Sequence, residues 1–491
     1  MTLNQVWEPA ILPKGRKAIT TTWAFAVKQT STGELKKLKA RLCARGFLQR
    51  QGLDYGLTWS PVCRTTTIRM FIAVSAFLGI EISQLDIVTA FLNAPLGELV
   101  FIKYPKGVTP TAGFDCLRLR RAIYGLKQAS FEWFKLLSQH LIKNGYQQSD
   151  LDPCLFTKKG VWIAIYVDDI LVMTLDPADT EIFKKILKAR FKCTDIGYAK
   201  WILGIEVLRH KDGSVELSLE RYVQDVIARF KMQDAKPVST PLAANVHLEK
   251  RDPDDSRVVD IKNYMSIIGS LMYAAQVGRP DLVFSVHKLA RYMSNPSTEH
   301  VNAAYRVIRY LLAYPKYSLV YRKADKLVLE GFTDSDWAGD LDSRNSTSGF
   351  CFRLDPASAI IAWISRLQKS TALSTCEAEF YAASLTVQEA MWLRGLLAEF
   401  IGKFSEPTTL HCDNQATVRL GEEGTSHKRM KHILIRLAFL RDMVAKKVVK
   451  LRYIPTTQNL ADFFTKSLGR LIFVRLRKSN MKGGPVVITG V

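Results

Sequence analysis

Two short apolar runs, far apart in the chain, are each followed by carboxylates. Asp86 closes a strand-like run, and Asp168 with Asp169 separates the apolar runs 162–166 and 170–173. Two strands joined by so short a connection form a tight hairpin, which pushes Asp168 outward while the flanking runs stay buried. Carboxylate oxygens are the ligands that magnesium prefers, and a pocket lined by them suits a pair of divalent metals. Paired aspartates also occur in solvated turns, so this motif alone leaves a structural explanation open.

A second group of acidic residues occurs in the last third of the chain. Asp334 follows the predicted strand 327–332, and Asp413 follows the predicted strand 408–412. We prefer Asp334 to Asp336 because it comes directly after its strand. An aspartate at a strand end commonly caps the next helix, so helix capping is the alternative role for Asp413. The other members are Glu377 or Glu379, on a long helix that starts near Ser374, and Asp462, which follows a last predicted strand.

The charge balance favours a polyanionic partner. The 491 residues carry a formal charge of +23, with a pI near 9.6, which favours nucleic acid through attraction and counterion release. No amphipathic basic helix dominates, and the longest apolar stretch, 71–82, is too short and interrupted to cross a bilayer, so we expect neither membrane association nor secretion. The eight cysteines contain no Cys-x-x-Cys pair, so we expect reduced thiols rather than a zinc site or disulfides.

The remaining pattern predicts a globular chain of mixed α/β type with two to four domains. Residues 21–29 and 38–44 alternate like strands on either side of a turn at 31–34, which predicts a basic hairpin. Between 233 and 258 the composition shifts to Pro, Asp, Ser and Ala, which predicts a linker. Helical spacing is found over 66–78, 129–144, 179–191, 264–276, 281–294 and 299–313.

Longer motifs connect these pieces to a known family. The runs 39–47, 52–55, 59–62, 85–93, 124–129 and 166–169 read KARLCARGF, GLDY, WSPV, LDIVTAFLN, YGLKQA and YVDD. In this order they closely resemble the reverse transcriptase of copia-type (pseudovirid) LTR retrotransposons, and the resemblance runs from about Trp7 to about Arg477. It implies an α/β (α+β) architecture, with a right-hand polymerase fold of fingers, palm and thumb-like region, a helical connection and an RNase H-like domain.

The resemblance also divides the chain. It implies a reverse transcriptase at 1–235, with a primer-grip hairpin near 201–206, and a linker with a helical thumb or connection region at 236–325. An RNase H-like domain is expected at 326–470 and a C-terminal tail at 471–491.

The implied polymerase copies RNA into DNA by two-metal phosphoryl transfer. Asp86 and Asp168 would bind both metals, with Asp169 a weaker or indirect ligand. Mg²⁺ is expected at two ions per active site, with Mn²⁺ as the alternative. Substrate binding is expected from Lys39 and Arg41, whose cations would hold the incoming triphosphate, from Phe91 as a gate beneath the sugar, and from Tyr124 and Gly125. The alternative for Phe91 is that it is a core residue, and a core position is compatible with the gate role.

The implied ribonuclease H uses a set of four carboxylates around two metals to degrade the RNA strand of a hybrid. Its order of Asp, Glu, Asp and Asp matches Asp334, Glu379, Asp413 and Asp462. Glu379 is preferred to Glu377 because the apolar residues 380–383 that follow it match the family's pattern after its catalytic Glu.

The implied partners are an RNA template, a DNA or tRNA primer, dNTPs and an RNA–DNA hybrid. A homodimer is an open alternative, and no membrane is expected. The resemblance also implies that DNA synthesis takes place in cytoplasmic virus-like particles, with the nucleus as the alternative location.

The sequence departs from the family pattern at several positions. Copia-type elements usually carry Asp at the position of Leu434 and Tyr-His at 437–438, and ASFEW at 129–133 replaces their Ala-Pro-Arg-x-Trp. His432 remains, but a lone histidine is more often a structural or surface residue. Since capsid, protease and integrase patterns are absent, we expect a fragment of a polyprotein or the product of a truncated copy. The alternative function is a catalytically inactive relic that binds nucleic acid through its basic surface, while a purely structural protein leaves both carboxylate sets unexplained.

Overall fold

The structure, a computed structural model, describes residues 5–29, 35–244, 246–422 and 434–483. The predicted turn at 31–34 and His432 lie outside these ranges. Within them, no helix combines the length and apolar character that crossing a bilayer requires.

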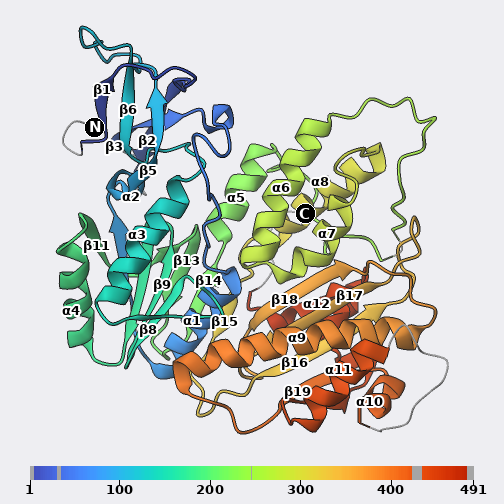
Figure 1. The fold of residues 1–491 in the computed structure, drawn as a ribbon. Coiled ribbons are helices and arrows are strands. Elements are labelled where there is room, and N and C mark those ends of the chain that lie inside the picture. The colour runs from blue at the N-terminus through green and yellow to red at the C-terminus, as the bar shows by residue number, and fades with distance from the viewer. Residues whose placement is uncertain (1–4, 30–34, 245, 423–433, 484–491) are drawn as a thin grey trace. The chain divides into compact units, whose positions relative to one another are not determined.

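Contacts between residues divide the chain into two units (Figure 1). The first unit comprises Met1–Arg64 and Glu81–Tyr198, and the second comprises Thr65–Ile80 and Ala199–Val491. Residues 199–235, which the sequence analysis assigned to the reverse transcriptase part, therefore pack with the C-terminal half of the chain.

A six-stranded antiparallel sheet forms the centre of the first unit, in the order β11-β4-β10-β9-β8-β7. The middle strands β9 and β10 are apolar along most of their length, and both of their faces are buried. Helices α3 (Ala129–Lys143) and α4 (Pro177–Lys188) contact each other, since His140 Nε2 lies 3.1 Å from the Ile186 carbonyl oxygen. The strands are β4 (Ile82–Ile87), β7 (Gln147–Gln148), β8 (Leu155–Lys158), β9 (Val161–Tyr166), β10 (Asp169–Thr174) and β11 (Cys193–Tyr198).

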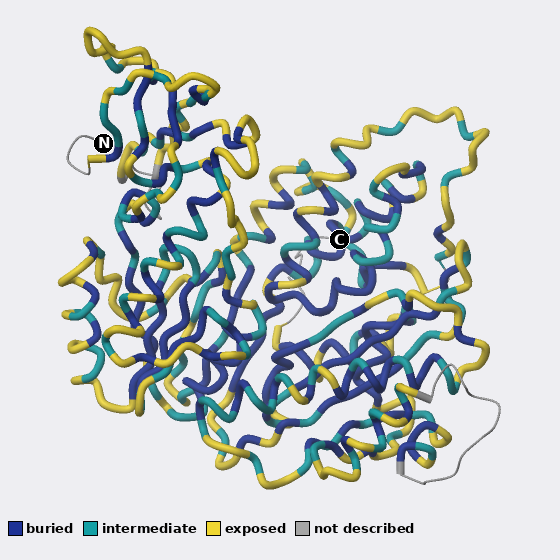
Figure 2. The backbone as a smooth tube through the Cα atoms, in the orientation of Figure 1, coloured by how far each residue is buried: buried dark blue, intermediate teal, exposed yellow. Residues whose placement is uncertain are grey.

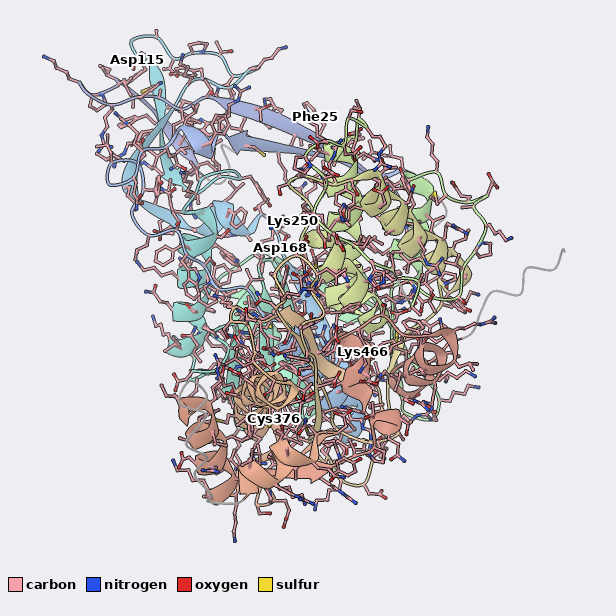
Figure 3. The ribbon with its side chains drawn as sticks, turned by 90° about the vertical axis from the view of Figure 1, so that its right-hand side faces the viewer. Phe25, Asp115, Asp168, Lys250, Cys376 and Lys466 are labelled. Carbon is pink, nitrogen blue, oxygen red and sulfur yellow. The ribbon has the colours of Figure 1, made fainter. Side chains whose placement is uncertain are left out.

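The first unit also contains a two-stranded ribbon with two different faces, made of β2 (Thr21–Gln29) and β3 (Leu35–Ala44). Alternation places Phe25 on the apolar face, where it is 78% exposed and projects into solvent (Figure 3). Lys39 and Arg41 lie on the other face, opposite Ala26 and Ala24. The basic hairpin is therefore formed as predicted. The same unit holds the sheet β1-β6-β5 (Trp7–Ala10, Cys116–Arg121, Pro95–Ile102), η2 (Gly46–Leu48) and the short helix α2 (Ala90–Asn93).

The second unit is built on a mixed five-stranded sheet in the order β18-β17-β16-β19-β20. β16, β17 and β18 are antiparallel neighbours, whereas β19 and β20 join β16 in parallel. The long helix α9 (Thr375–Ile401) connects β18 to β19 and packs on β16, and Figure 2 shows buried backbone concentrated in these strands. The strands are β16 (Glu330–Asp336), β17 (Thr347–Arg353), β18 (Ile360–Leu367), β19 (Thr408–Cys412) and β20 (Val449–Tyr453).

Helix α1 (Thr65–Leu78) joins the second unit through a buried arginine. Arg69 Nε donates to the Ile361 carbonyl oxygen of β18 at 2.7 Å, and its guanidinium lies 3.9 Å from the centre of the Trp363 ring. Burial lowers the pKa of Arg69 to about 10. Phe71 adds an edge-to-face contact with Phe400 of α9. These contacts fix α1 to the sheet, although Arg69 and Ile361 are 292 residues apart in the chain.

A helical region precedes the five-stranded sheet. The predicted linker, 233–258, contains no helix or strand where the structure describes it, and three predicted helices follow. Arg279 and Asp281 form a fully buried ion pair at 2.6 Å, and the Tyr310 hydroxyl donates to the same Asp281 carboxylate at 2.6 Å. The elements are α5 (Glu220–Arg229), α6 (Ile261–Val277), η3 (Pro280–Leu282), α7 (Val283–Ala290), α8 (Thr298–Ala313), and the sheet β12-β13-β14-β15 (Trp201–Ile202, Ile205–Arg209, Val215–Ser218, Leu319–Tyr321).

The predicted C-terminal tail begins with a docked helix. Helix α12 (Arg470–Asn480) buries Arg477, which donates to the Tyr310 hydroxyl at 2.8 Å and stacks 3.9 Å from the Tyr314 ring centre. The remaining elements are α10 (Gln415–Glu422), α11 (Leu434–Ala445), η4 (Thr456–Gln458) and η5 (Leu460–Phe464).

Candidate active sites

In the first unit, strand register pairs two of the three predicted aspartates, and the third lies in the adjoining turn. In the described residues, the three do not form a group whose ligand atoms all lie within 4.8 Å of one another. Asp169, the first residue of β10, lies directly opposite Asp86 of β4. Asp168 occupies the turn between β9 and β10 (Figure 3), and its carbonyl oxygen accepts from the Ile87 amide at 2.9 Å. Gln84 Nε2 donates to Asp169 Oδ1 at 3.1 Å, which engages one oxygen of that carboxylate.

The turn that carries Asp168 is strained, and hydrogen bonds from α3 and β4 hold it in place. Val167 has φ of 57°, a left-handed conformation that costs a β-branched residue about 1–3 kcal/mol. Trp133 Nε1 of α3 donates to the Val167 carbonyl oxygen at 2.7 Å. Together with the Ile87 amide, this bond fixes both carbonyls of the two-residue loop and so fixes the direction of Asp168.

Three of the predicted substrate-binding residues, Phe91, Tyr124 and Arg41, form one cluster centred on Tyr124. The rings of Phe91 and Tyr124 meet edge to face at 4.9 Å, and the Arg41 guanidinium lies 5.4 Å from the Tyr124 ring centre. Burial raises the pKa of Tyr124; Arg41 opposes that shift, while Asp168 and Asp86 add to it. The structure therefore places Tyr124 within electrostatic reach of Asp168 and Asp86, and Arg41 beside Tyr124. Lys39 is half-buried on the same face of β3, two residues from Arg41.

Gly125 allows β3 to approach the segment that carries Tyr124. The Ala44 amide donates to the Tyr124 carbonyl oxygen at 2.7 Å, and Gly125 follows with φ of 86°. A Cβ on Gly125 would overlap the Ala44 carbonyl oxygen, and one on Gly46 would overlap the Gly125 carbonyl oxygen. Gly46 was not selected from the sequence. Its only signal there was a glycine inside the basic KARLCARGF run.

In the second unit, the parallel strands β16 and β19 bring the other carboxylates to one edge of the sheet. Oxygen atoms of Asp334, Asp413 and Asp462 lie within 4.8 Å of one another, and Glu379, Cys412 and Asp413 form an overlapping group within the same limit. Asp334, Glu379 and Asp462 are only 3%, 6% and 4% exposed. Asp334 lies inside β16, which runs to Asp336, so the prediction that it follows the strand was wrong. The apolar run ends at Phe332, but the ladder with β17 continues past it.

Burial and mutual repulsion make these carboxylates hard to ionise. Burial, with a contribution from Asp462, raises the pKa of Asp334 to about 6, although Lys466 opposes the shift. Burial, together with Asp334 and Asp413, raises the pKa of Glu379 well above its usual range, and burial and Asp334 raise the pKa of Asp413. Such a buried oxygen cage fits a divalent cation, which offsets the repulsion.

The structure separates the alternatives that the sequence left open. The Glu377 side chain accepts from the Leu373 amide at 2.7 Å at the start of α9, whereas a Glu379 oxygen accepts from the Ser335 amide at 3.1 Å beside Asp334. Asp336 is on the same strand as Asp334 but is absent from the groups of converging ligand atoms in the described chain. The geometry thus brings Glu379 and Asp334, rather than Glu377 and Asp336, into the cage.

Two residues that contact the carboxylate cage, Lys466 and Thr465, were not predicted from the sequence. Lys466 Nζ lies 2.7 Å from Asp462 Oδ1 and 3.8 Å from Asp334 Oδ2, and the Thr465 hydroxyl donates to Asp334. The four-residue spacing from Asp462 to Lys466 was a signal available in the sequence.

One of the departures from the family pattern, Leu437, is a buried residue of α11. The neighbouring Arg436 stacks 3.7 Å from the Tyr381 ring centre on α9. The apolar residue at 437 therefore serves packing.

We expect Gly125→Ala to disturb the contact between β3 and the Tyr124 segment. The added methyl meets backbone, which should destabilise the first unit by about 2–4 kcal/mol in urea unfolding. Gly113→Ala is the matched control, because Gly113 has a similar φ of 81° but open space around its Cβ position. It should cost about 1 kcal/mol. Equal losses for the two variants would contradict the proposed close approach.

Comparisons with known proteins show the family to which the chain is similar. Residues 4–244 match the reverse transcriptase (RNA-dependent DNA polymerase) family. The chain is 35% identical over 479 residues to the retrovirus-related Pol polyprotein from transposon TNT 1-94 of Nicotiana tabacum, covering 95% of this chain and 36% of the relative. It is 36% identical to the corresponding polyprotein from transposon RE1 of Arabidopsis thaliana, covering 96% of this chain and 32% of the relative. A transposon Ty5-1 protein of Saccharomyces cerevisiae is 32% identical over its whole length, which matches 62% of this chain.

The chain spans about a third of the length of the two plant polyproteins. The match over nearly all of its own residues, together with the reverse transcriptase family match, places it in one family. The chain belongs to the reverse transcriptase family of copia-type retrotransposon Pol polyproteins.

Proposed function

We propose that this chain copies RNA into DNA at the first carboxylate set and degrades the RNA strand of the resulting hybrid at the second. The observation that carries this proposal is the placement of acidic residues at two places. Asp169 pairs with Asp86 next to the turn that holds Asp168, and carboxylate oxygens of Asp334, Asp413 and Asp462 lie within 4.8 Å of one another. The substrates would be an RNA template, a primer with a free 3′-hydroxyl, and dNTPs. The proposed parts are the reverse transcriptase at 1–235, the helical connection at 236–325, and the RNase H-like domain at 326–470.

In the proposed polymerase site, Asp86 and Asp168 hold both magnesium ions, and Asp169 is a weaker ligand because Gln84 engages one of its oxygens. When bound, the two ions supply activation of the primer 3′-oxygen and neutralise the pyrophosphate that leaves. Arg41 and Lys39 would bind the triphosphate from the basic face of the β2–β3 ribbon. Tyr124 supports the Phe91 ring, which would exclude a 2′-hydroxyl beneath the sugar.

In the proposed RNase H site, Asp334, Glu379, Asp413 and Asp462 hold two magnesium ions at the edge of the five-stranded sheet. A mixed sheet with a long helix across β16 supports an RNase H-like fold. With two ions bound, the site would hold the scissile phosphate and activate a water that attacks its phosphorus. The bond from phosphorus to the 3′-oxygen would break, which leaves a 3′-hydroxyl. Selection of the hybrid requires the 2′-hydroxyls of one strand, so pure DNA should resist cleavage.

The alternative is a catalytically inactive relic that binds nucleic acid through its charge of +23. Both functions predict binding to RNA and DNA that weakens with salt. Only the enzyme predicts magnesium-dependent incorporation of dNTPs, so primer extension separates them.

We expect the purified protein to extend a primer on an RNA template when magnesium is present. The Asp168→Asn substitution should lower that rate at least about 1,000-fold, because it removes one metal-binding carboxylate. The measurement is single-turnover primer extension, with and without EDTA. Asp150→Asn, an exposed aspartate of the same unit, is the control and should retain the rate. A magnesium-independent or absent rate in the unaltered protein would support the relic.

Phe91→Val should raise ribonucleotide incorporation. Loss of the ring opens space beneath the sugar, and steric discrimination of this kind is worth about 10–100-fold. The ratio of kcat/KM for rNTP and dNTP measures it. Phe114→Val, at an exposed aromatic residue of the same unit, should leave the ratio unchanged. Unchanged sugar discrimination in Phe91→Val would remove the gate role.

Asp413→Asn should abolish cleavage of the RNA strand in an RNA–DNA hybrid while primer extension continues, because the two carboxylate sets are separate. Gel analysis of a labelled hybrid reports cleavage, and a labelled DNA duplex tests substrate selection. Asp442→Asn, at a surface ion pair of α11, is the matched control. Intact hybrid cleavage in Asp413→Asn would show that the metal assignment in the second unit is wrong.

A further inference from the structure

Lys466 contributes a cation to the buried cage of the second unit. Its Nζ lies 2.7 Å from Asp462 Oδ1 and 3.8 Å from Asp334 Oδ2, and the side chain is 36% exposed. The two aspartates are nearly buried, at 4% and 3% exposure. An ammonium between two such groups offsets their repulsion, since buried like charges at these separations interact strongly.

The backbone that carries Lys466 is fixed to the sheet. Asn459 Nδ2 donates to the Thr333 carbonyl oxygen at 2.9 Å, and the Thr465 hydroxyl donates to Asp334. Gly349 of β17 permits this close approach, because a Cβ there would lie 2.7 Å from Thr465 Cγ2 and 2.9 Å from Phe464 Cβ. The Lys466 side chain, with four flexible carbons and partial exposure, is the part of this segment that can move without breaking these contacts.

A divalent cation on the cage would bind the carboxylates of Asp334 and Asp462, which Lys466 also contacts. Magnesium binds carboxylate oxygens at about 2.1 Å, and the ammonium already lies 2.7 Å from Asp462 Oδ1. Two cations at such distances from one oxygen repel each other strongly, so they exclude each other at this position. Asp413, the third member of the cage, also interacts with Lys466.

We propose that Lys466 is an internal cation that occupies one metal position of the cage and that a divalent metal must displace it to bind. This inference rests on the proposed metal role of Asp334, Asp413 and Asp462. It assigns to Lys466 a positioning function: it holds the metal-free carboxylates in place, and it sets the metal concentration at which the cage fills.

The test measures Mn²⁺ binding directly by electron paramagnetic resonance of free Mn²⁺, in the full chain with Asp168→Asn to weaken the other carboxylate set. We expect Lys466→Gln to bind Mn²⁺ about tenfold more tightly, because a competing charge is removed. Lys446→Gln is the matched control, since Lys446 has the same four-residue spacing and the same 2.7 Å distance to Asp442, but on the exposed surface. Its Mn²⁺ affinity should equal that of the parent.

A purely structural Lys466 would leave Mn²⁺ affinity unchanged or lower in Lys466→Gln, and either result would overturn the proposal. Lys466→Arg keeps the competing charge and serves if the glutamine variant fails to fold. Its Mn²⁺ affinity should equal or fall below that of the parent, and tighter binding would refute displacement. If the parent shows no Mn²⁺ binding that Asp413→Asn removes, the proposed metal role itself fails, which is a different outcome from unchanged affinity in Lys466→Gln.

Discussion

The register of neighbouring strands forces like charges together, and both candidate sites depend on it. Carboxylates repel each other, so they do not converge by themselves; the hydrogen-bonded ladders and buried apolar side chains must supply the free energy. In the first unit, pairing of β10 with β4 sets Asp169 opposite Asp86, and the apolar residues of β9 and β10 lie in the core. In the second unit, the parallel pairing of β16 with β19 brings Asp334 and Asp413 to one edge of the sheet. A shift of one residue in either ladder would send these side chains to the opposite face.

Much of this arrangement could be predicted from local pattern. The apolar runs on either side of Asp168 and Asp169 predict two strands and a tight turn, and β9 and β10 have those positions. The linker near 233–258, the basic hairpin and the start of α9 after Ser374 follow from composition, alternation and capping in the same way. These features are determined by residues close together in the chain, so they can be recognised from the sequence alone. The roles of the site residues stay predictions.

What the sequence did not predict depends on distant partners. Arg69 looks like one charged residue in an apolar helix, and only the fold brings it to the Ile361 carbonyl oxygen. Gly46 matters because the backbone of another segment, at Gly125, passes against it. Arg477 lies in the segment that the resemblance assigned to a C-terminal tail, and it is buried against Tyr310 and Tyr314. In each case, the residue type is informative only once its long-range contact is known.

The two carboxylate sets differ in burial, and this difference explains why one of them contains a lysine. Asp86, Asp168 and Asp169 are all partly exposed, so water can stabilise their charges. Asp334, Glu379 and Asp462 are almost completely buried, and water reaches them poorly. A buried carboxylate without a cation takes up a proton, as the raised pKa values of Asp334 and Glu379 indicate. Lys466 opposes the rise in the pKa of Asp334 and Asp413 and so lowers the cost of ionising them, although burial still dominates. The first set is partly exposed to water, and Arg41 and Lys39, which we propose bind the triphosphate, lie on the β2–β3 ribbon.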